Sequence, residues 1–572
     1  MRRMRAILAL TLLLGIAACT GDDRPPPARD PMTVALSADS RAPAPAVAGA
    51  KPGGTVTVLV NNPFEHLDPG RTYISRAQLT NLLLQRTLTA FRHRRDGGGL
   101  ELVGDLATDT GRATEGGRVW TYTLRSGLRF EDGSPITSKD VAYGIARSFS
   151  PDLSDGPTWL QQWLAGTADF RSRYRGPYDG GAPTAPGVST PDGRTIVLRF
   201  PRPRPDLPFA VAQGNTTPVP QARDTRGEYD LKPVATGPYK IERYDRRREL
   251  VLVRNEYWSA GTDPIRTAYP DRFVYLFGQS PAVATQRILA AKGADRAAVS
   301  LERVPSELLL TVAADNALAA HATVGTTPYV GYLRINTERV TDIAVRRALN
   351  CALNRDGFIK TVGGRGTAEP ATTILSPIIA GFHAYNAYDC GPTGDPVRAA
   401  EMLGNRRISL RYGYRDSDQG AALATFLKAS LGAAGFDLTT VPIDPAMYYT
   451  TVRTRDNGLD IYMHTWGADW PTGESVLPAL FDGRTIAARG NSNTSYLSDD
   501  FVNSEIDRIE SISDLSQAAN AWGALDEQIM RDHAPLVPVY YDRALSLNGA
   551  LVGGLSLHDI MGGTSLENAF VR

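Results

Sequence analysis

The chain has 572 residues, of which 42% are hydrophobic and 22% are charged, a composition typical of a folded protein but too long for a single hydrophobic core. Lysine and arginine together number 62 and aspartate and glutamate 61, so the chain lacks the basic excess expected of a nucleic-acid-binding protein. We therefore expect two or three domains and no nucleic-acid partner.

The first twenty residues have the pattern of a secretory leader. Three arginines within the first five residues precede an apolar run, residues 6–16, that is too short to span a bilayer comfortably. Ala17, Ala18 and Cys19 follow, and a cysteine after small residues at the cleavage point resembles the bacterial lipobox. The resemblance implies a lipoprotein signal peptide over residues 1–18 and lipid attachment to Cys19. An ordinary signal peptide with a chance cysteine is the alternative.

Residues 19–52 are rich in proline, alanine, aspartate and serine and contain few large apolar side chains. Such a segment buries too little surface to fold, and its prolines favour an extended chain. We expect a disordered tether that holds a globular body near a membrane through lipidated Cys19. No later segment reaches eighteen uninterrupted apolar residues, so we expect no second membrane anchor.

The body after the tether begins with strands and helices that indicate an α/β fold. Residues 54–60 form a β-branched run typical of a buried strand, and residues 119–124 alternate like a half-buried strand. Thr137 and Asp140 have the spacing of a capping box before an apolar helix.

Five motifs along the body carry a resemblance to a known family. They are Trp120–Tyr143, Ala235–Ile241, Leu250–Trp258, Ile343–Leu349 with Asn354–Asp356, and Pro535–Tyr541. Their residues and their order resemble family 5 of the bacterial extracellular solute-binding proteins, which are the peptide-, dipeptide- and nickel-binding components of ABC importers. The resemblance covers residues 53–572.

This resemblance implies an α/β, two-lobed periplasmic-binding-protein-like fold of the class with an extra subdomain. The lobes of such a fold close around a ligand about a hinge of two crossing strands. The expected parts are lobe I over residues 53–329 plus 542–572, its extra subdomain over about 78–193, and lobe II over 330–541. The crossing strands are expected near Thr327–Val330 and Tyr540–Tyr541.

The segment 459–480 contains the leading candidate for a binding residue. Asp469 stands between Trp466 and Trp470, and no lysine or arginine lies near it in the sequence. If this carboxylate is buried it needs a cationic partner, which is either a distant arginine of the same chain or a cation from outside. An exposed turn aspartate beside two half-buried tryptophans is the alternative.

Peptide binders of family 5 have a Trp-x-Ala-Asp segment at this place, and its aspartate contacts the free α-ammonium of a bound peptide. Trp466, Ala468 and Asp469 match this segment, so the resemblance implies that Asp469 holds the amino terminus of a ligand. Gly467 is compatible with a close approach of the backbone to that ligand. The residues after position 471 depart from the family pattern, which leaves ligand length and side-chain preference open.

Enzymatic motifs are missing from the sequence. It contains no Gly-x-Ser-x-Gly elbow, no His-Glu-x-x-His, no P-loop and no dinucleotide glycine pattern. The seven histidines lack metal-ligand spacing, and His464 is expected to be a packed or rim residue rather than a metal ligand. We therefore expect no catalytic residues, no metal and no cofactor. A secreted hydrolase is the alternative from another class.

The sequence thus predicts a monomeric, lipid-anchored, extracytoplasmic substrate-binding protein. It would capture small peptides by their amino terminus and deliver them to an ABC permease. Phe64 and Tyr332 are further ligand-binding candidates by location alone. The alternative within the same fold is a receptor for another solute, such as an oligosaccharide, an opine-like compound or a nickel chelate.

Cys351 and Cys390 are the cysteines that remain once Cys19 is acylated. An exported protein sits in an oxidising compartment, so this even pair predicts a disulfide. Two free buried thiols are the alternative.

Overall fold

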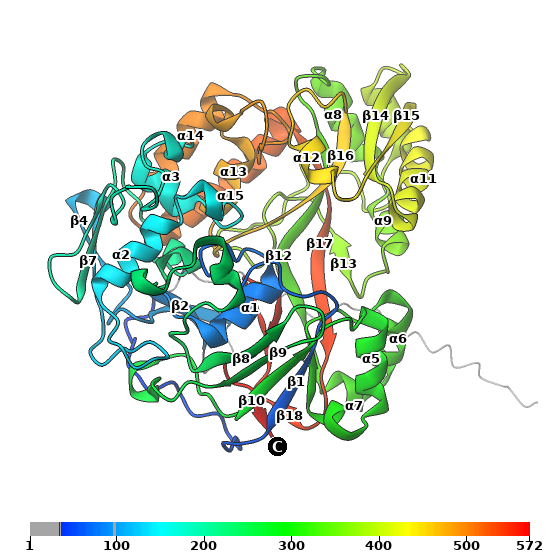
Figure 1. The fold of residues 1–572 in the computed structure, drawn as a ribbon. Helices are drawn as coiled ribbons and strands as arrows, with labels where there is room; N and C mark the ends of the chain where they lie inside the picture. The colour runs from blue at the N-terminus through cyan, green and yellow to red at the C-terminus, as the bar shows by residue number, and fades with distance from the viewer. Residues whose placement is uncertain (1–33, 35, 95–98) are drawn as a thin grey trace, which may run out of the picture.

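The computed structural model describes residues 34, 36–94 and 99–572. They form two α/β lobes, and two long strands run from one lobe to the other (Figure 1). The predicted signal peptide and Cys19 lie outside these residues. None of the helices within them is both long enough and apolar enough to cross a bilayer.

Lobe I is built on a five-stranded sheet in the order β11-β1-β10-β9-β8. Its strands are β1 (Thr55–Leu59), β8 (Tyr239–Asp245), β9 (Glu249–Arg254), β10 (Arg272–Leu276) and β11 (Ala298–Ser300). The helices of this lobe are α1 (Ser75–Leu84), α5 (Pro281–Ala290), α6 (Ser306–Ala314) and α7 (Asn316–Ala319). β1 runs parallel to both of its neighbours, β10 and β11. Its β-branched residues Val56 and Val58 are fully buried, as a central strand covered on both faces requires.

Lobe II is built on a six-stranded sheet in the order β13-β17-β12-β16-β14-β15. Its strands are β12 (Ala322–Ile335), β13 (Ala368–Pro370), β14 (Ile408–Arg415), β15 (Phe436–Ile443), β16 (Ile461–Gly467) and β17 (Leu536–Leu547). One face packs against α8 (Ile343–Ala352), α9 (Arg355–Thr361) and α11 (Asp418–Gly432). The other face packs against α13 (Leu477–Phe481), α14 (Asp500–Glu510) and α15 (Leu515–His533).

A subdomain extends lobe I. Its four-stranded sheet has the order β4-β5-β7-β6 and stands beside the hairpin of β2 and β3. The elements are β2 (Thr89–His93), β3 (Leu100–Gly104), β4 (Arg112–Thr114), β5 (Val119–Thr123), β6 (Val188–Ser189), β7 (Thr195–Arg199), α2 (Ser138–Arg147), α3 (Trp159–Ala165) and α4 (Leu207–Ala210). The predicted capping box is present at α2, where Asp140 Oδ2 accepts from the Thr137 amide at 2.8 Å.

The subdomain boundaries differ from the expected range of about 78–193. α1 packs into the core of lobe I, whereas the subdomain core begins at Leu88 and continues to Val234. β7 also lies beyond the expected end, and it pairs along its whole length with β5. The strand pairing that assigns β7 to this sheet is a long-range contact, so the order of motifs along the chain did not reveal it.

β12 and β17 form an antiparallel pair that passes lengthwise from one lobe to the other (Figure 1). The register of the pair shifts between Thr326 and Val330. Pro328 lies within this break and has no N–H to donate to the ladder. The irregular segment 327–329 therefore coincides with the expected crossing point, and hinge motion there stays a prediction.

Residues 36–52 lie against the body. Leu36 forms a bridge with Leu102, and the Ser40 hydroxyl accepts a hydrogen bond from the Gly104 amide at 2.9 Å. The prediction of a disordered tether is therefore wrong for this part of 19–52. Its side chains bury little surface, but its polar groups find partners on the folded body.

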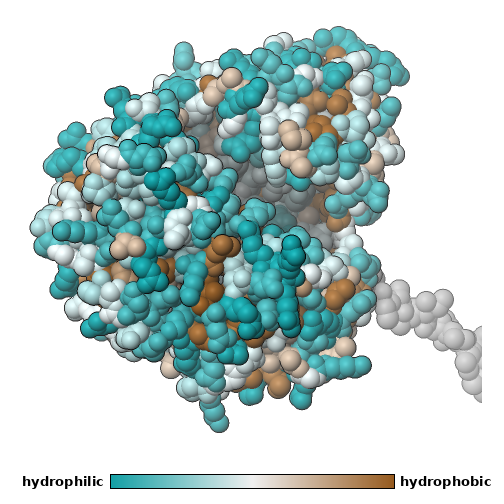
Figure 2. Space-filling view, in the orientation of Figure 1, coloured by the Kyte–Doolittle hydropathy of each residue, from teal (hydrophilic) through white to brown (hydrophobic). Residues whose placement is uncertain are grey.

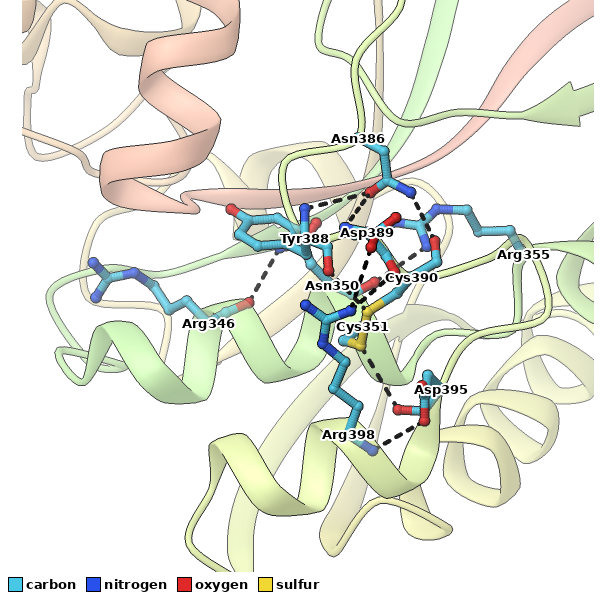
Figure 3. The surroundings of a disulfide bond; sticks show 10 residues. All are labelled: Arg346, Asn350, Cys351, Arg355, Asn386, Tyr388, Asp389, Cys390, Asp395 and Arg398. Carbon is cyan, nitrogen blue, oxygen red and sulfur yellow. Dashed lines mark hydrogen bonds and ion pairs between the residues drawn. A yellow bond between two sulfur atoms is a disulfide. The ribbon is translucent and has the colours of Figure 1, made fainter.

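A disulfide joins Cys351, at the end of α8, to Cys390, in the loop before α10 (Pro396–Met402), with Cα atoms 5.2 Å apart (Figure 3). The Asn386 side-chain amide donates to the Cys390 carbonyl at 2.9 Å within the loop, and the Asp395 amide donates to the Cys351 carbonyl of α8 at 2.8 Å. The bridge closes a segment with a sequence separation of 39 within lobe II.

Removing this bridge should destabilise lobe II. The chain-entropy relation for a closed segment of this length gives a loss of about 3 to 4 kcal/mol in the free energy of unfolding for the Cys351→Ala/Cys390→Ala variant, measured by urea titration. Thiol titration supplies the direct check on denatured, unreduced protein that begins after Cys19. It should find two thiols only after reduction, and two reactive thiols before reduction would contradict the pairing.

Candidate ligand-binding site

Asp469 lies half-buried just after β16, where lobe II meets the subdomain. Its Oδ2 accepts hydrogen bonds from the Tyr73 hydroxyl at 2.8 Å and from the Trp159 indole N–H at 2.6 Å. Its backbone carbonyl accepts from Gln213 Nε2 at 3.1 Å. Each of these donors is at least 256 residues away in the sequence, so no local pattern marks Tyr73, Trp159 or Gln213 as members of the site.

A groove separates the two lobes. Figure 2 shows the surface hollowed between the part at upper right, which carries β14, β15 and α11 in Figure 1, and the rest of the molecule. β16 and α12 (Tyr448–Val452) lie on the lobe II side of this hollow (Figure 1). Ligands of two-lobed binding proteins occupy such an interlobe position, where closure excludes water.

The electrostatic state of Asp469 is unusual for a carboxylate. Burial raises the pKa of Asp469 to about 6, and the hydrogen bonds from Trp159 and Tyr73 oppose that rise. Within the described residues, no Lys, Arg or His pairs with this carboxylate and no donor reaches its Oδ1. At neutral pH Asp469 therefore carries a charge that only neutral donors stabilise, and one of its oxygens is free for another partner.

The other residues of the motif pack around Asp469. The Trp466 indole N–H donates to the Ser475 carbonyl at 3.2 Å, and Ala468 is buried in the lobe II core. A Cβ atom at Gly467 would lie 2.4 Å from the ring of Tyr329. The close approach that requires a glycine here is thus made by Tyr329.

Phe64 and Tyr332 lie away from this site. Phe64 is fully buried in the core of lobe I, edge-on to Tyr275 with ring centroids 5.7 Å apart. Tyr332 is fully buried in the core of lobe II and donates its hydroxyl to the Ile374 carbonyl. The structure does not bring either side chain to Asp469, because position along the chain does not determine the face to which a side chain points.

Trp470 attaches lobe II to the subdomain. Its ring is fully buried, with centroids 5.2 Å from Trp159 and 5.8 Å from Trp163. Its indole N–H donates to Asp206 Oδ2 at 2.8 Å. The ring belongs to the subdomain core, whereas Ala468, two residues earlier, belongs to the lobe II core. Trp470 therefore stabilises the contact in which Tyr73 and Trp159 bind the preceding residue, Asp469.

A cluster of ionisable groups spans the same contact. Arg204 Nη1 lies 2.8 Å from Glu510 Oε2 and 3.7 Å from Glu474 Oε1. Burial raises the pKa of Asp206 to about 6, and burial together with the neighbouring carboxylates raises the pKa of Glu474. Because Asp206 binds its proton more tightly in this contact than in water, the contact gains stability as the pH falls below about 6.

The described residues contain no group of three or more His, Cys, Asp or Glu side chains arranged to hold a metal ion. His464 is buried on β16, and burial with the nearby Arg334 lowers the pKa of His464 to about 3. It is a neutral, packed imidazole at physiological pH.

Comparisons with known proteins agree with this architecture. Residues 101–487 match the family model described as "Bacterial extracellular solute-binding proteins, family 5 Middle". The periplasmic murein peptide-binding protein MppA of Escherichia coli is 24% identical over 465 residues, which is 77% of this chain and 80% of that protein. The probable deoxycholate-binding periplasmic protein YgiS of Escherichia coli is 25% identical over 473 residues, 78% of this chain and 81% of that protein.

A solved structure, that of clavulanic acid biosynthesis oligopeptide binding protein 2, superimposes with a TM-score of 0.84 at 31% identity and covers 91% of this chain and 96% of that chain. The predicted α/β, two-lobed fold is thereby confirmed. The names of these relatives refer to peptides in one case and to deoxycholate in another, so similarity at this level does not fix the ligand.

Proposed function

Because the chain belongs to family 5 of the bacterial extracellular solute-binding proteins, we propose that it captures small peptides by their free amino terminus and delivers them to an ABC permease. The proposal includes an extracytoplasmic location and a lipid anchor on Cys19. Two of the similar proteins named above, MppA and oligopeptide binding protein 2, are named for peptide binding, which supports a peptide ligand. The similar proteins are binding proteins, which supports binding without catalysis.

The free Oδ1 of Asp469 is the observation that carries the proposal. An α-ammonium has three N–H donors and a positive charge, and it would provide both the donor and the opposite charge that this oxygen lacks. Tyr73 and Trp159 already orient the carboxylate through Oδ2, so the ligand would meet a fixed acceptor. A group without a positive charge would leave the carboxylate uncompensated in the closed groove.

The test is the identity of the ligand. Mass spectrometry of solutes released from natively purified protein should detect peptides with free amino termini, and calorimetry should show binding of those peptides but not of their N-acetylated forms. A sugar, an opine or a metal chelate among the released solutes would replace the proposal with the alternative ligand class. Equal affinity for free and acetylated peptides would refute the role of the amino terminus.

Binding should depend on pH in a bell-shaped manner. Asp469 is ionised only above its pKa of about 6, and a peptide α-ammonium is charged only below about 8. Both charges coexist between these limits, so the affinity should fall about tenfold per pH unit on either side, measured by calorimetry. Asp206 in the cluster around Arg204 also has a pKa of about 6, and its protonation favours the contact between lobe II and the subdomain at low pH, so Asp469→Asn serves as the control. The Asp469→Asn variant should no longer lose affinity as the pH falls below 6. If the loss below pH 6 is unchanged in that variant, Asp469 is not the group that titrates.

A further inference from the structure

Arg334 on β12 is a buried guanidinium that has no hydrogen-bond acceptor among the described residues. The side chain is fully buried, and none of its three nitrogens meets a hydrogen-bond acceptor in the described parts of the chain. The guanidinium lies over the ring of Tyr332 at 5.0 Å from its centroid, a contact that offers no acceptor for the N–H groups. Burial lowers the pKa of Arg334 to about 10, so the group is charged at neutral pH. A buried charge without compensation is costly, and proteins pair such groups.

Arg334 shares one face of the lobe II sheet with three other side chains. It pairs across the ladder with Tyr462, and Tyr332 pairs with His464, so the four side chains point to the same side. His464 Nδ1 is also buried and has no partner among the described residues. Since this imidazole is neutral, it has one N–H to donate.

The loop of residues 493–495 contacts Tyr462 on this face and the chain just after β12. The Tyr462 hydroxyl donates to the carbonyl of Thr494. The amide of Thr337, three residues beyond Arg334, donates to the carbonyl of Ser495 at 2.9 Å. These backbone contacts place the loop against the end of β12 that carries Arg334.

The loop adds further buried polar groups near this face. The hydroxyls of Thr494 and Ser495 are buried and unpartnered within the described residues, as is the side-chain oxygen of Asn493. A single amide oxygen cannot satisfy the five N–H groups of a guanidinium. We propose that Arg334, with the hydroxyls of Thr494 and Ser495, binds a small anion: a carboxylate or an inorganic anion of similar size.

A second cation lies on the solvent side of His464. Tyr449 is 46% exposed and lies edge-on to His464 with ring centroids 5.6 Å apart. The guanidinium of Arg415 stacks on Tyr449, 4.6 Å from its ring centroid. A positive charge at the surface raises the local concentration of anions there.

The anion has two possible sources. His464 precedes Asp469 by five positions, which corresponds to at most about 16 Å, and an extended peptide of about five residues spans that distance. A peptide that lies along β16 with its amino terminus on Asp469 would bring its carboxylate toward Arg334. This source rests on the proposed function, whereas an inorganic anion does not.

Thermal unfolding of the full-length protein in sodium formate and in sodium gluconate of equal ionic strength tests the site itself. Formate should raise the melting temperature of the wild-type protein by about 1 to 3 °C relative to gluconate, because a ligand that binds only the native state stabilises it. Arg334→Met should remove this difference. Arg355→Met is the matched control, because Arg355 is equally buried but donates to the carbonyl of Pro538 at 2.8 Å. It should keep the formate effect.

The Thr494→Val/Ser495→Ala variant retains Arg334 and should weaken the formate effect, so the test does not depend on the folding of Arg334→Met. An equal response of the wild-type protein to formate and gluconate, together with no effect of ligand amidation, would overturn the proposal. Persistence of the formate effect in Arg334→Met would overturn it as well.

Calorimetry with a library of tetra- and pentapeptides, as free acids and as C-terminal amides, identifies the source. If the ligand carboxylate is the anion, amidation should weaken binding to the wild-type protein about a hundredfold and leave binding to Arg334→Met unchanged. If amidation has no effect but the formate effect persists, the site takes an inorganic anion. If no peptide binds in either form while the formate effect persists, the proposed function fails and the anion site stands.

Discussion

Replacing Asp469 with asparagine is expected to weaken the binding of a peptide with a free amino terminus by about a hundredfold to a few thousandfold. The substitution removes one partner of a desolvated ion pair, which costs about 3 to 5 kcal/mol, and each 1.4 kcal/mol corresponds to a factor of ten. Asparagine keeps an oxygen that accepts from Tyr73 and Trp159, so the geometry of the contact is preserved. Calorimetry with a peptide identified by mass spectrometry measures the loss.

A double cycle with the N-acetylated peptide tests the contact itself. Acetylation should weaken binding to the wild-type protein as much as the substitution does, and should add little in Asp469→Asn. Additive losses would show that Asp469 and the amino terminus do not interact, and Asp469 would then be a structural residue of the interlobe contact.

The stability of Asp469→Asn separates lost binding from lost folding. The native state holds the pKa of Asp469 at about 6, above its ordinary value of 3.8, so the ionised form destabilises the native protein above pH 6. Removing the charge should therefore raise the unliganded melting temperature at pH 7 and leave it unchanged below pH 4. A large fall at both pH values would point to a damaged fold.

Local sequence patterns predicted individual strands and helix ends correctly. The β-branched run at residues 54–60 forms β1, and Thr137 with Asp140 caps α2. The motif order carried the two-lobed architecture, because the motifs fall in the subdomain, in lobe I and in lobe II in turn. The same signals misplaced the subdomain end, since β7 joins its sheet by a pairing that no short motif encodes.

The sequence predicted only the lobe II part of the candidate site. The sequence identifies Asp469 by its neighbours, but Tyr73 and Trp159 reach it by folding from the other lobe. The burial of Arg334 could not be predicted from the sequence either. A polar residue among alternating apolar ones indicates a solvent-exposed face, yet β12 lies inside a sheet covered on both faces, and Arg334 is buried. Burial of a strand on two faces is a property of the sheet and not of the strand sequence.

Replacing Trp470 with alanine is expected to open the lobes in the absence of ligand. The ring of Trp470 fills the subdomain core although its backbone continues the lobe II segment, so its packing energy holds the two parts together. Truncating a buried tryptophan costs about 3 to 5 kcal/mol, which would shift the ratio of closed to open molecules toward the open form by about a hundredfold or more. Small-angle scattering should show a larger radius of gyration for the unliganded variant.

Opening should also release Asp469 from its two donors, because Trp159 packs on Trp470 and binds the carboxylate at the same time. The Trp470→Ala variant should therefore bind peptide more weakly, and saturating peptide should restore a compact shape about the β12–β17 crossing. Phe436→Ala is the matched control, since Phe436 is equally buried but lies within the lobe II core. It should lower the melting temperature and leave the radius of gyration unchanged. If Trp470→Ala behaves in the same way as this control, Trp470 stabilises the fold alone, and the closed arrangement around Asp469 depends on other contacts.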